Sequence, residues 1–315
     1  MACPEAGASI GVRWKARQRW PKCIPAATIA VLATLMMLFA VPRAHAEAPA
    51  GGGRWLEFET PLRASGQGSR STRVWLPPSY DRADAATRRY PVVVFLHGWP
   101  GGEGNWPGHG RAGETLGALS HAGRIPEVIG LFPDGGGTGV LGRSLWLDSW
   151  DGRAKLETFL VHDLLAWADS AFRTRADAAH RAVIGLSDGA TGALNLLIHH
   201  PGLFGAAGGH SGEYLIRNDL SSGRIFGPEP GATRLREAAS PLLAIRAAAD
   251  HLRGMHIYLD CGEDDDAIGD SRALHARLDS LGVRHTYAEY PHGHDWNYWR
   301  EHLAQSLEAV TSGMK

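Results

Sequence analysis

Short apolar runs and helix-like patterns alternate along most of the chain. The clearest run, Tyr90 to Leu96 (YPVVVFL), is almost continuously apolar and rich in β-branched residues, which predicts a strand covered on both faces. Alternation of such runs with helical patterns predicts an α/β fold with a largely parallel sheet. Further strands are predicted near Arg73 to Leu76, Val128 to Phe132, Arg181 to Gly185, Met255 to Asp260 and Arg284 to Tyr290.

Helical patterns lie between these strands. Apolar residues from Leu156 to Phe172 recur mostly three or four positions apart, which predicts an amphipathic helix packed on the sheet. Residues 211–254 differ, because they are rich in Gly, Pro and Ser to about Ser240 and become helical only from Leu242 to Leu252. We interpret 211–254 as an insertion that is either a lid or binding loop, or a surface elaboration.

The first 46 residues have the pattern of a secretory signal peptide. Basic residues precede an uncharged apolar run from Cys23 to Val41, and Ala44-His45-Ala46 supplies a small-residue cleavage site. Cleavage near Ala46 predicts an exported protein, periplasmic or extracellular, without stable membrane insertion. An uncleaved membrane anchor is the alternative, because the run is almost long enough to span a bilayer. Residues 47–72 are then a linker and first strand region, and 73–315 form one domain.

Charge and cysteine content narrow the functional classes. The chain has 32 Lys and Arg against 33 Asp and Glu, and removal of 1–46 leaves 26 against 32, a net charge of −6. An acidic protein of this kind has no basic surface for nucleic acid. Cys261 is the only cysteine outside the first 46 residues, so no internal disulfide is expected.

A nucleophile motif lies between a predicted strand and a predicted helix. The sequence Gly185-Leu186-Ser187-Asp188-Gly189 is a G-x-S-x-G, and the helical pattern from Ala190 to His199 follows it directly. In this context a sharp strand-to-helix turn exposes the Ser187 hydroxyl, and the glycines relieve crowding. A serine hydroxyl needs a base to remove its proton, so a histidine and an orienting acid should follow later in the chain.

Two later loops offer the acid and the base. A predicted strand ends in the carboxylate cluster of Glu263, Asp264, Asp265 and Asp266, and the last strand is followed by a loop with His292 and His294. The residues alone leave the choice within each loop open. The acidic cluster lacks the spacing of a calcium loop, and one H-x-H without further ligands is weak for zinc, so no metal is predicted.

The oxyanion of an acyl-transfer reaction needs preorganised N–H donors. One donor should be the backbone amide of Asp188, the residue after the nucleophile. The second should come from the glycine-rich loop His97-Gly98-Trp99-Pro100-Gly101-Gly102, whose glycines let the backbone approach a substrate closely.

Longer motifs around these residues carry a family resemblance. The most specific are VVVFLHGWPGGEGNW (Val92 to Trp106), VIGLSDG (Val183 to Gly189) and HGHDWNYWREHL (His292 to Leu303). With these motifs, from about Arg73 to Leu307, the chain resembles the esterase D-like branch of the α/β-hydrolases. That branch includes bacterial feruloyl esterases, siderophore ester hydrolases and mycobacterial mycolyltransferases.

The resemblance implies a single-domain α/β-hydrolase with a mostly parallel central sheet and helices on both faces. It implies a serine esterase that works through an acyl-enzyme on a small-molecule or carbohydrate ester, with no cofactor. It selects Asp265 as the acid, His294 as the base and Trp99 as the second oxyanion amide. An acyltransferase that uses the same site with an alcohol acceptor is one alternative. A catalytically silent carbohydrate- or partner-binding module is another.

Two features of these loops have to be tested against the structure: the direction of the Asp188 side chain and the role of the tryptophans. The family usually has Met and Gly where this chain has Asp188 and Ala190, and a carboxylate aimed at the oxyanion would repel its charge. We therefore predict that the Asp188 side chain points away from Ser187. Tryptophans in the same loops either stack on substrate or pack beneath the loops. The predicted substrate-binding candidates are Trp106, Trp146, Trp150 and Trp296.

Overall fold

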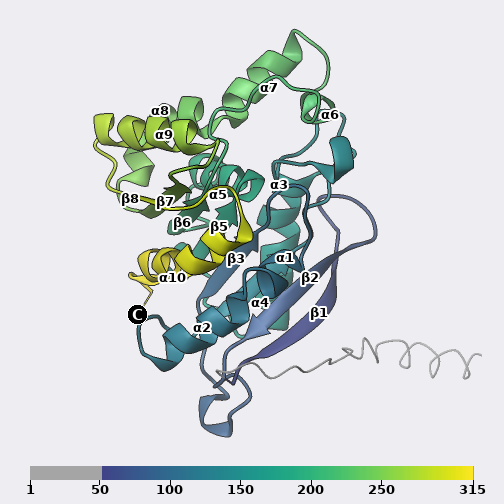
Figure 1. Cartoon of the computed structure of the whole chain (residues 1–315). Helices are drawn as coiled ribbons and strands as arrows, with labels where there is room; N and C mark the ends of the chain where they lie inside the picture. The colour runs from purple at the N-terminus through teal and green to yellow at the C-terminus, as the bar shows by residue number, and fades with distance from the viewer. Residues whose placement is uncertain (1–51, 315) are drawn as a thin grey trace, which may run out of the picture. The chain divides into compact units, whose positions relative to one another are not determined.

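An eight-stranded sheet forms the centre of the computed structural model, which describes residues 52–314 (Figure 1). The strand order is β1-β2-β4-β3-β5-β6-β7-β8. The six strands β3 to β8 run parallel to one another, and β2 is antiparallel to both of its neighbours, β1 and β4. The mostly parallel sheet predicted from the sequence is thus confirmed. The strands are β1 (Arg54–Pro61), β2 (Ser69–Leu76), β3 (Val92–Leu96), β4 (Ile129–Pro133), β5 (Arg181–Leu186), β6 (Ala206–His210), β7 (His256–Gly262) and β8 (Thr286–Tyr290).

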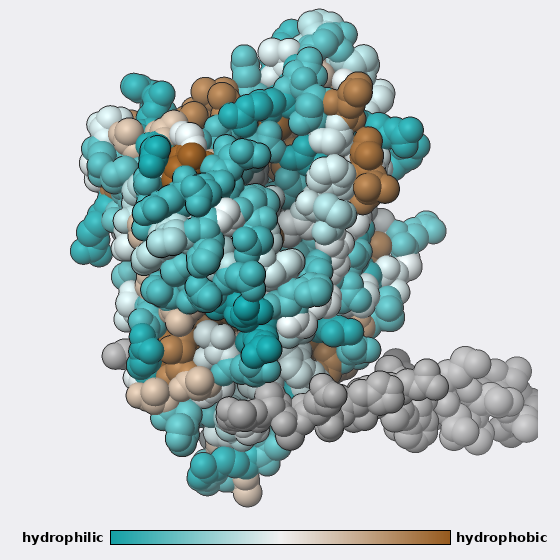
Figure 2. Space-filling model, viewed as in Figure 1, coloured by the Kyte–Doolittle hydropathy of each residue, from teal (hydrophilic) through white to brown (hydrophobic). Residues whose placement is uncertain are grey.

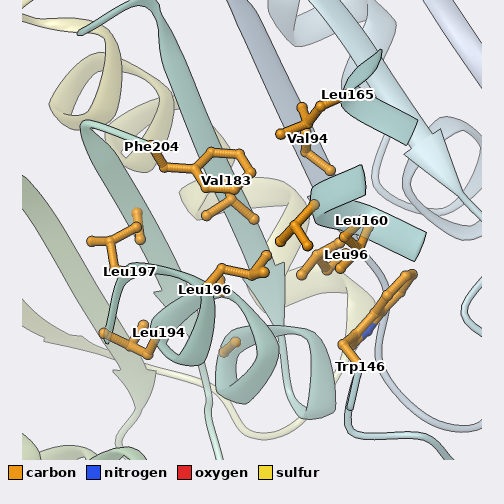
Figure 3. Close-up of a cluster of buried hydrophobic side chains, with 14 of the residues drawn as sticks. Val94, Leu96, Trp146, Leu160, Leu165, Val183, Leu194, Leu196, Leu197 and Phe204 are labelled. Atoms are coloured by element: carbon orange, nitrogen blue, oxygen red, sulfur yellow. The ribbon is translucent and has the colours of Figure 1, made fainter. Parts of the chain in front are cut away.

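Helices cover both faces of this sheet. Alternate side chains of β3 enter different cores, since Val92 and Val94 join one apolar cluster while Val93 and Phe95 join the other. Figure 3 shows part of the first cluster, to which Leu194 and Leu197 of α5 and Val183 of β5 belong. α2 and α10 lie on the second face. The helices are α1 (Asn105–Gly108), α2 (Ala112–His121), α3 (Leu156–Thr158), α4 (Leu165–Ala171), α5 (Asp188–His199), α6 (Gly223–Phe226), α7 (Gly231–Ala239), α8 (Pro241–Leu252), α9 (Ile268–Ser280) and α10 (Trp296–Thr311).

The predicted helix over 156–172 is present, with an internal change of pitch. α3 and α4 are joined by one wider π-helical segment, Phe159–Leu164. Asp163 in this segment is 5% exposed and accepts hydrogen bonds from the backbone amides of Ala64 and Ser65, at 2.8 and 2.9 Å. The helix therefore also fixes the turn that connects β1 and β2.

β1 and the start of β2 lie within 47–72, the range in which a linker and a first strand region were predicted. Two other segments correct the sequence predictions. β6 was not predicted, because its sequence AAGGH has no β-branched residue. A Cβ at Gly209 would lie 2.3 Å from the Tyr214 hydroxyl, so close packing excludes a larger residue there. α7 falls in the part of 211–254 that was predicted to be irregular, whereas α8 matches its predicted helix.

The surface and the ends of the described chain add little to the fold. One face of the molecule is mostly hydrophilic, with small separate apolar patches (Figure 2). Within residues 52–314, no helix has both the length and the apolarity that a membrane crossing requires. The predicted signal peptide, 1–46, lies outside the described residues.

Cys261 in β7 is buried, and burial raises the pKa of its thiol to about 12.

Candidate active site

Ser187 sits at a tight turn between β5 and α5. Its backbone has φ 53° and ψ −122°, a conformation that non-glycine residues rarely adopt and that functional turns maintain through their packing. Both flanking glycines are required by close approach of the backbone. A Cβ at Gly185 would lie 2.0 Å from the carbonyl oxygen of Gly189, and a Cβ at Gly189 would lie 2.2 Å from that of Leu96. The turn therefore matches the geometry expected of a nucleophile elbow.

The structure brings His294 and Asp265 to this serine. His294, in the loop between β8 and α10, has its Nε2 3.0 Å from the Ser187 Oγ. Its Nδ1 lies 3.0 Å from each carboxylate oxygen of Asp265, which follows β7. Asp265 is 2% exposed; burial alone would raise its pKa, but hydrogen bonds from His294 and the Ala267 amide lower it below its ordinary value. Asp265 is thus held as a carboxylate that orients the imidazole.

Two backbone amides beside Ser187 were predicted to stabilise an oxyanion, those of Trp99 and Asp188. A Cβ at Gly98 would be 3.0 Å from the Ser187 Cβ, so the segment leading to Trp99 passes directly beside the nucleophile. Within the described residues, neither the Trp99 amide nor the Asp188 amide is paired with a protein acceptor. Both amides are therefore available as donors to a developing oxyanion.

The Asp188 carboxylate is held by a buried guanidinium. Arg143 forms two hydrogen bonds to it, Nε to Oδ2 at 2.9 Å and Nη2 to Oδ1 at 2.8 Å, and both side chains are only 7% exposed. Burial alone would lower the pKa of Arg143, but bonding to Asp188 and the charge of Glu213 raise it above its ordinary value. The guanidinium also lies 5.4 Å from the ring centroid of Trp99. Arg143 therefore contacts the side chains of both residues whose amides are predicted to bind the oxyanion.

Two cavities meet at Ser187 and differ in chemistry. The first, about 460 Å³, is lined mostly by charged groups and includes Arg217, Asp266 and Asp270. The second, about 330 Å³, is largely aromatic and is walled by Trp296 and Trp299. Trp99 and His294 border both cavities. Residues 213–221 of the predicted insertion form part of the charged wall, while a lid movement of 211–254 stays a prediction.

The four tryptophans predicted to bind substrate lie in three different settings. Trp296 lines the aromatic cavity beside Ser187. Trp106 and Trp146 are 1% and 2% exposed, and their indole N–H groups donate to the carbonyls of Leu96 and His97. These two rings pack beneath the loops and do not reach a substrate surface, which corrects that prediction. Trp150 is 53% exposed but lines another cavity, whose wall does not include Ser187.

Family membership follows from comparison of the whole domain. A family model for esterases matches residues 64–310, most of the chain. The chain belongs to the esterase family.

Individual relatives agree with this family. Esterase Rv1288 of Mycobacterium tuberculosis is 28% identical over 249 residues, covering 70% of this chain and 51% of the relative. An endo-1,4-β-xylanase/feruloyl esterase of Xylanibacter ruminicola is 27% identical over 243 residues, covering 76% of this chain and 29% of the relative. This chain spans about half the length, or less, of these two relatives. A solved ferulic acid esterase superposes with a TM-score of 0.74 at 25% identity, covering 84% of this chain and 99% of the other.

Sequence reasoning missed three residues of this candidate site. No sequence motif marks Arg143. Only the aspartate at position 188, where the family usually has Met, could have prompted a search for a cation that pairs with it. Trp299 stands edge-on to the His294 ring, with centroids 4.9 Å apart. Its indole N–H donates to the Ser211 hydroxyl at 3.1 Å. Ser211 follows β6, which was itself unpredicted, so its position beside the site could not be read from the sequence.

Proposed function

We propose that this esterase hydrolyses carboxylic esters through an acyl-enzyme on Ser187. The observation that carries the proposal is the continuous set of hydrogen-bond distances from Ser187 through His294 to Asp265, each 3.0 Å. His294 Nε2 takes the hydroxyl proton as Oγ attacks the ester carbonyl, and Asp265 stabilises the imidazolium that results. The amides of Trp99 and Asp188 donate to the oxyanion of the tetrahedral intermediate.

Collapse of this intermediate breaks the bond to the alcohol oxygen, which receives the proton from His294 and leaves. His294 then activates a water molecule, whose oxygen attacks the acyl carbon on Ser187. The second tetrahedral intermediate releases the carboxylic acid and returns the proton to the serine. Neither half-reaction requires a cofactor.

The two cavities support a substrate with unlike halves. Trp296 and Trp299 give the apolar walls that suit an aromatic ring. The other cavity presents carboxylates such as Asp266 and Asp270 together with Arg217, which suit the hydroxyl groups of a sugar or other polyol. We propose an aromatic acid esterified to a polar alcohol as the substrate class.

Kinetics with a chromogenic ester test the proposed mechanism. Ser187→Ala and His294→Ala should each lower kcat by several orders of magnitude while circular dichroism and the melting temperature stay close to wild type. A burst of chromophore should precede steady turnover where deacylation is slower. Turnover by Ser187→Ala equal to that of wild type would contradict the proposal. Added alcohols that divert the product to a new ester would identify acyl transfer instead.

The proposed site of action is outside the cytoplasm. This proposal rests on the basic, apolar and small-residue pattern of residues 1–46. Intact mass of the protein recovered from the host's exported fraction should place the new N-terminus near Glu47. An intact leader on the exported or membrane-bound protein would support an anchor.

A further inference from the structure

A group of metal-ligating side chains lies outside the proposed catalytic site. His275 and Asp279 are one turn apart on α9, and His285 lies in the segment that leads into β8. One ligand atom from each of the three side chains lies within 4.8 Å of the other two. His275 and His285 are half-buried, while Asp279 is exposed, so the group is open to solvent on one side.

The hydrogen bonds fix one imidazole in the form that binds a metal. The Nδ1 of His285 is 2.9 Å from the carbonyl oxygen of Val283. A carbonyl only accepts, so Nδ1 carries the proton and Nε2 presents its lone pair. This lone pair points at Nδ1 of His275, 2.8 Å away. A backbone carbonyl that orients a histidine in this way is the usual outer partner of a metal ligand.

The second imidazole is also held in place. The His275 ring stacks on Tyr287 of β8, with centroids 4.5 Å apart and planes at 16°. Its Nε2 is 3.6 Å from a carboxylate oxygen of Asp279. The Asp279 carboxylate and the two imidazoles therefore lie around one region, with a ligand atom of each within 4.8 Å of the other two.

We propose that His275, His285 and Asp279 bind a divalent zinc ion. Two imidazoles and a carboxylate are a typical protein ligand set for zinc, with water in the fourth position. Tetrahedral zinc with bonds of 2.0–2.1 Å separates its nitrogen ligands by about 3.3 Å. To bind one ion, the two imidazole nitrogens move apart by about half an ångström from their 2.8 Å contact, and the rings turn so that both lone pairs meet the metal.

The position of this site gives the ion a structural role. α9 begins at Ile268, three residues after Asp265, and β8 ends at Tyr290, four residues before His294. The ion would join these two elements at their other ends. We therefore expect binding to stabilise the domain, without any part in the ester chemistry.

Zinc titration of the full chain, purified without a polyhistidine tag and stripped with EDTA, tests the proposal. Calorimetry with zinc chloride should show one equivalent bound. His275→Ala, His285→Ala and Asp279→Asn should each raise Kd at least tenfold. Zinc at about 100 times Kd should raise the wild-type melting temperature by on the order of 5 °C. Cobalt(II) should give the visible absorption bands of tetrahedral coordination.

A matched control is available on another helical turn. His180 lies 2.6 Å from Asp177, three residues earlier, and among residues 52–314 it belongs to no group of three metal-ligating side chains. His180→Asn should leave zinc affinity unchanged. Failure of the wild type to bind zinc would overturn the proposal, as would wild-type affinity in both histidine variants or an equal loss in the control. Asp279→Asn keeps the test informative if a histidine variant folds poorly, because this side chain is exposed.

Discussion

Replacement of Arg143 by methionine tests whether Asp188 is tolerated only because it is paired. The variant removes a guanidinium that is 7% exposed and makes two hydrogen bonds to the Asp188 carboxylate. Removing one partner of a buried ion pair typically costs about 3–5 kcal/mol, because it leaves an uncompensated charge. Glu213 and Asp219, which also contact Arg143, are more exposed and can turn to water.

The effect on activity follows from Coulomb's law. An unpaired carboxylate opposes an oxyanion at a separation of about 5–8 Å by about 2–3 kcal/mol, at an effective dielectric constant of about 20. We therefore expect Arg143→Met to lower kcat/KM by roughly 30- to 200-fold. Added salt should recover only part of this loss, since buried charges are poorly screened.

The assay is hydrolysis of p-nitrophenyl acetate, a small ester that does not depend on the cavity walls, with melting temperature as a check on folding. The double variant Arg143→Met/Asp188→Asn removes the carboxylate as well and should recover most of kcat/KM. Arg217→Met is the matched control, because it removes an arginine that is 59% exposed in the same cavity and pairs with Asp270 instead. A double variant no more active than the single one would refute the reasoning.

Three further results are expected. The pKa of Asp265 is lowered in the folded state. The stabilisation that this carboxylate contributes is therefore present above its ordinary pKa of about 3.9 and is lost as the pH falls through the folded value. The urea midpoints of wild type and Asp265→Asn should converge below about pH 4. Gly189→Ala places a Cβ 2.2 Å from the Leu96 carbonyl, so it should abolish activity and lower the soluble yield, and a soluble variant with full activity would contradict the packing argument. Trp296→Ala should raise KM for aromatic esters with little change in melting temperature, whereas buried Trp106→Phe should lower the melting temperature; the reverse pattern would exchange their roles.

The sequence predicted the strands whose own residues form a strong apolar pattern. β3 is an uninterrupted apolar run, and its side chains are buried on both faces as such a run requires. β6 has the opposite character, since its two glycines, of which Gly209 makes room for Tyr214, carry no strand preference. Its existence follows from pairing with β5 and β7, which lie far from it in sequence.

The residues of the candidate site also differ in how far the sequence could predict them. Ser187 stands in a motif that its own neighbours define, whereas Asp265 could be separated from the adjacent carboxylates only by family resemblance. The structure distinguishes it physically, because its carboxylate is the one within hydrogen-bond reach of His294. Arg143 and Asp188 are 45 residues apart, and no spacing rule connects a loop arginine to a helix-start aspartate.

The buried thiol of β7 gives this protein an internal reporter. Thiol reagents react with the thiolate, and a pKa of about 12 leaves almost none of it while Cys261 stays enclosed. In protein that lacks residues 1–46, no other cysteine competes for the reagent. The rate of modification by a chromogenic disulfide therefore measures how often this part of the sheet opens, without an introduced label.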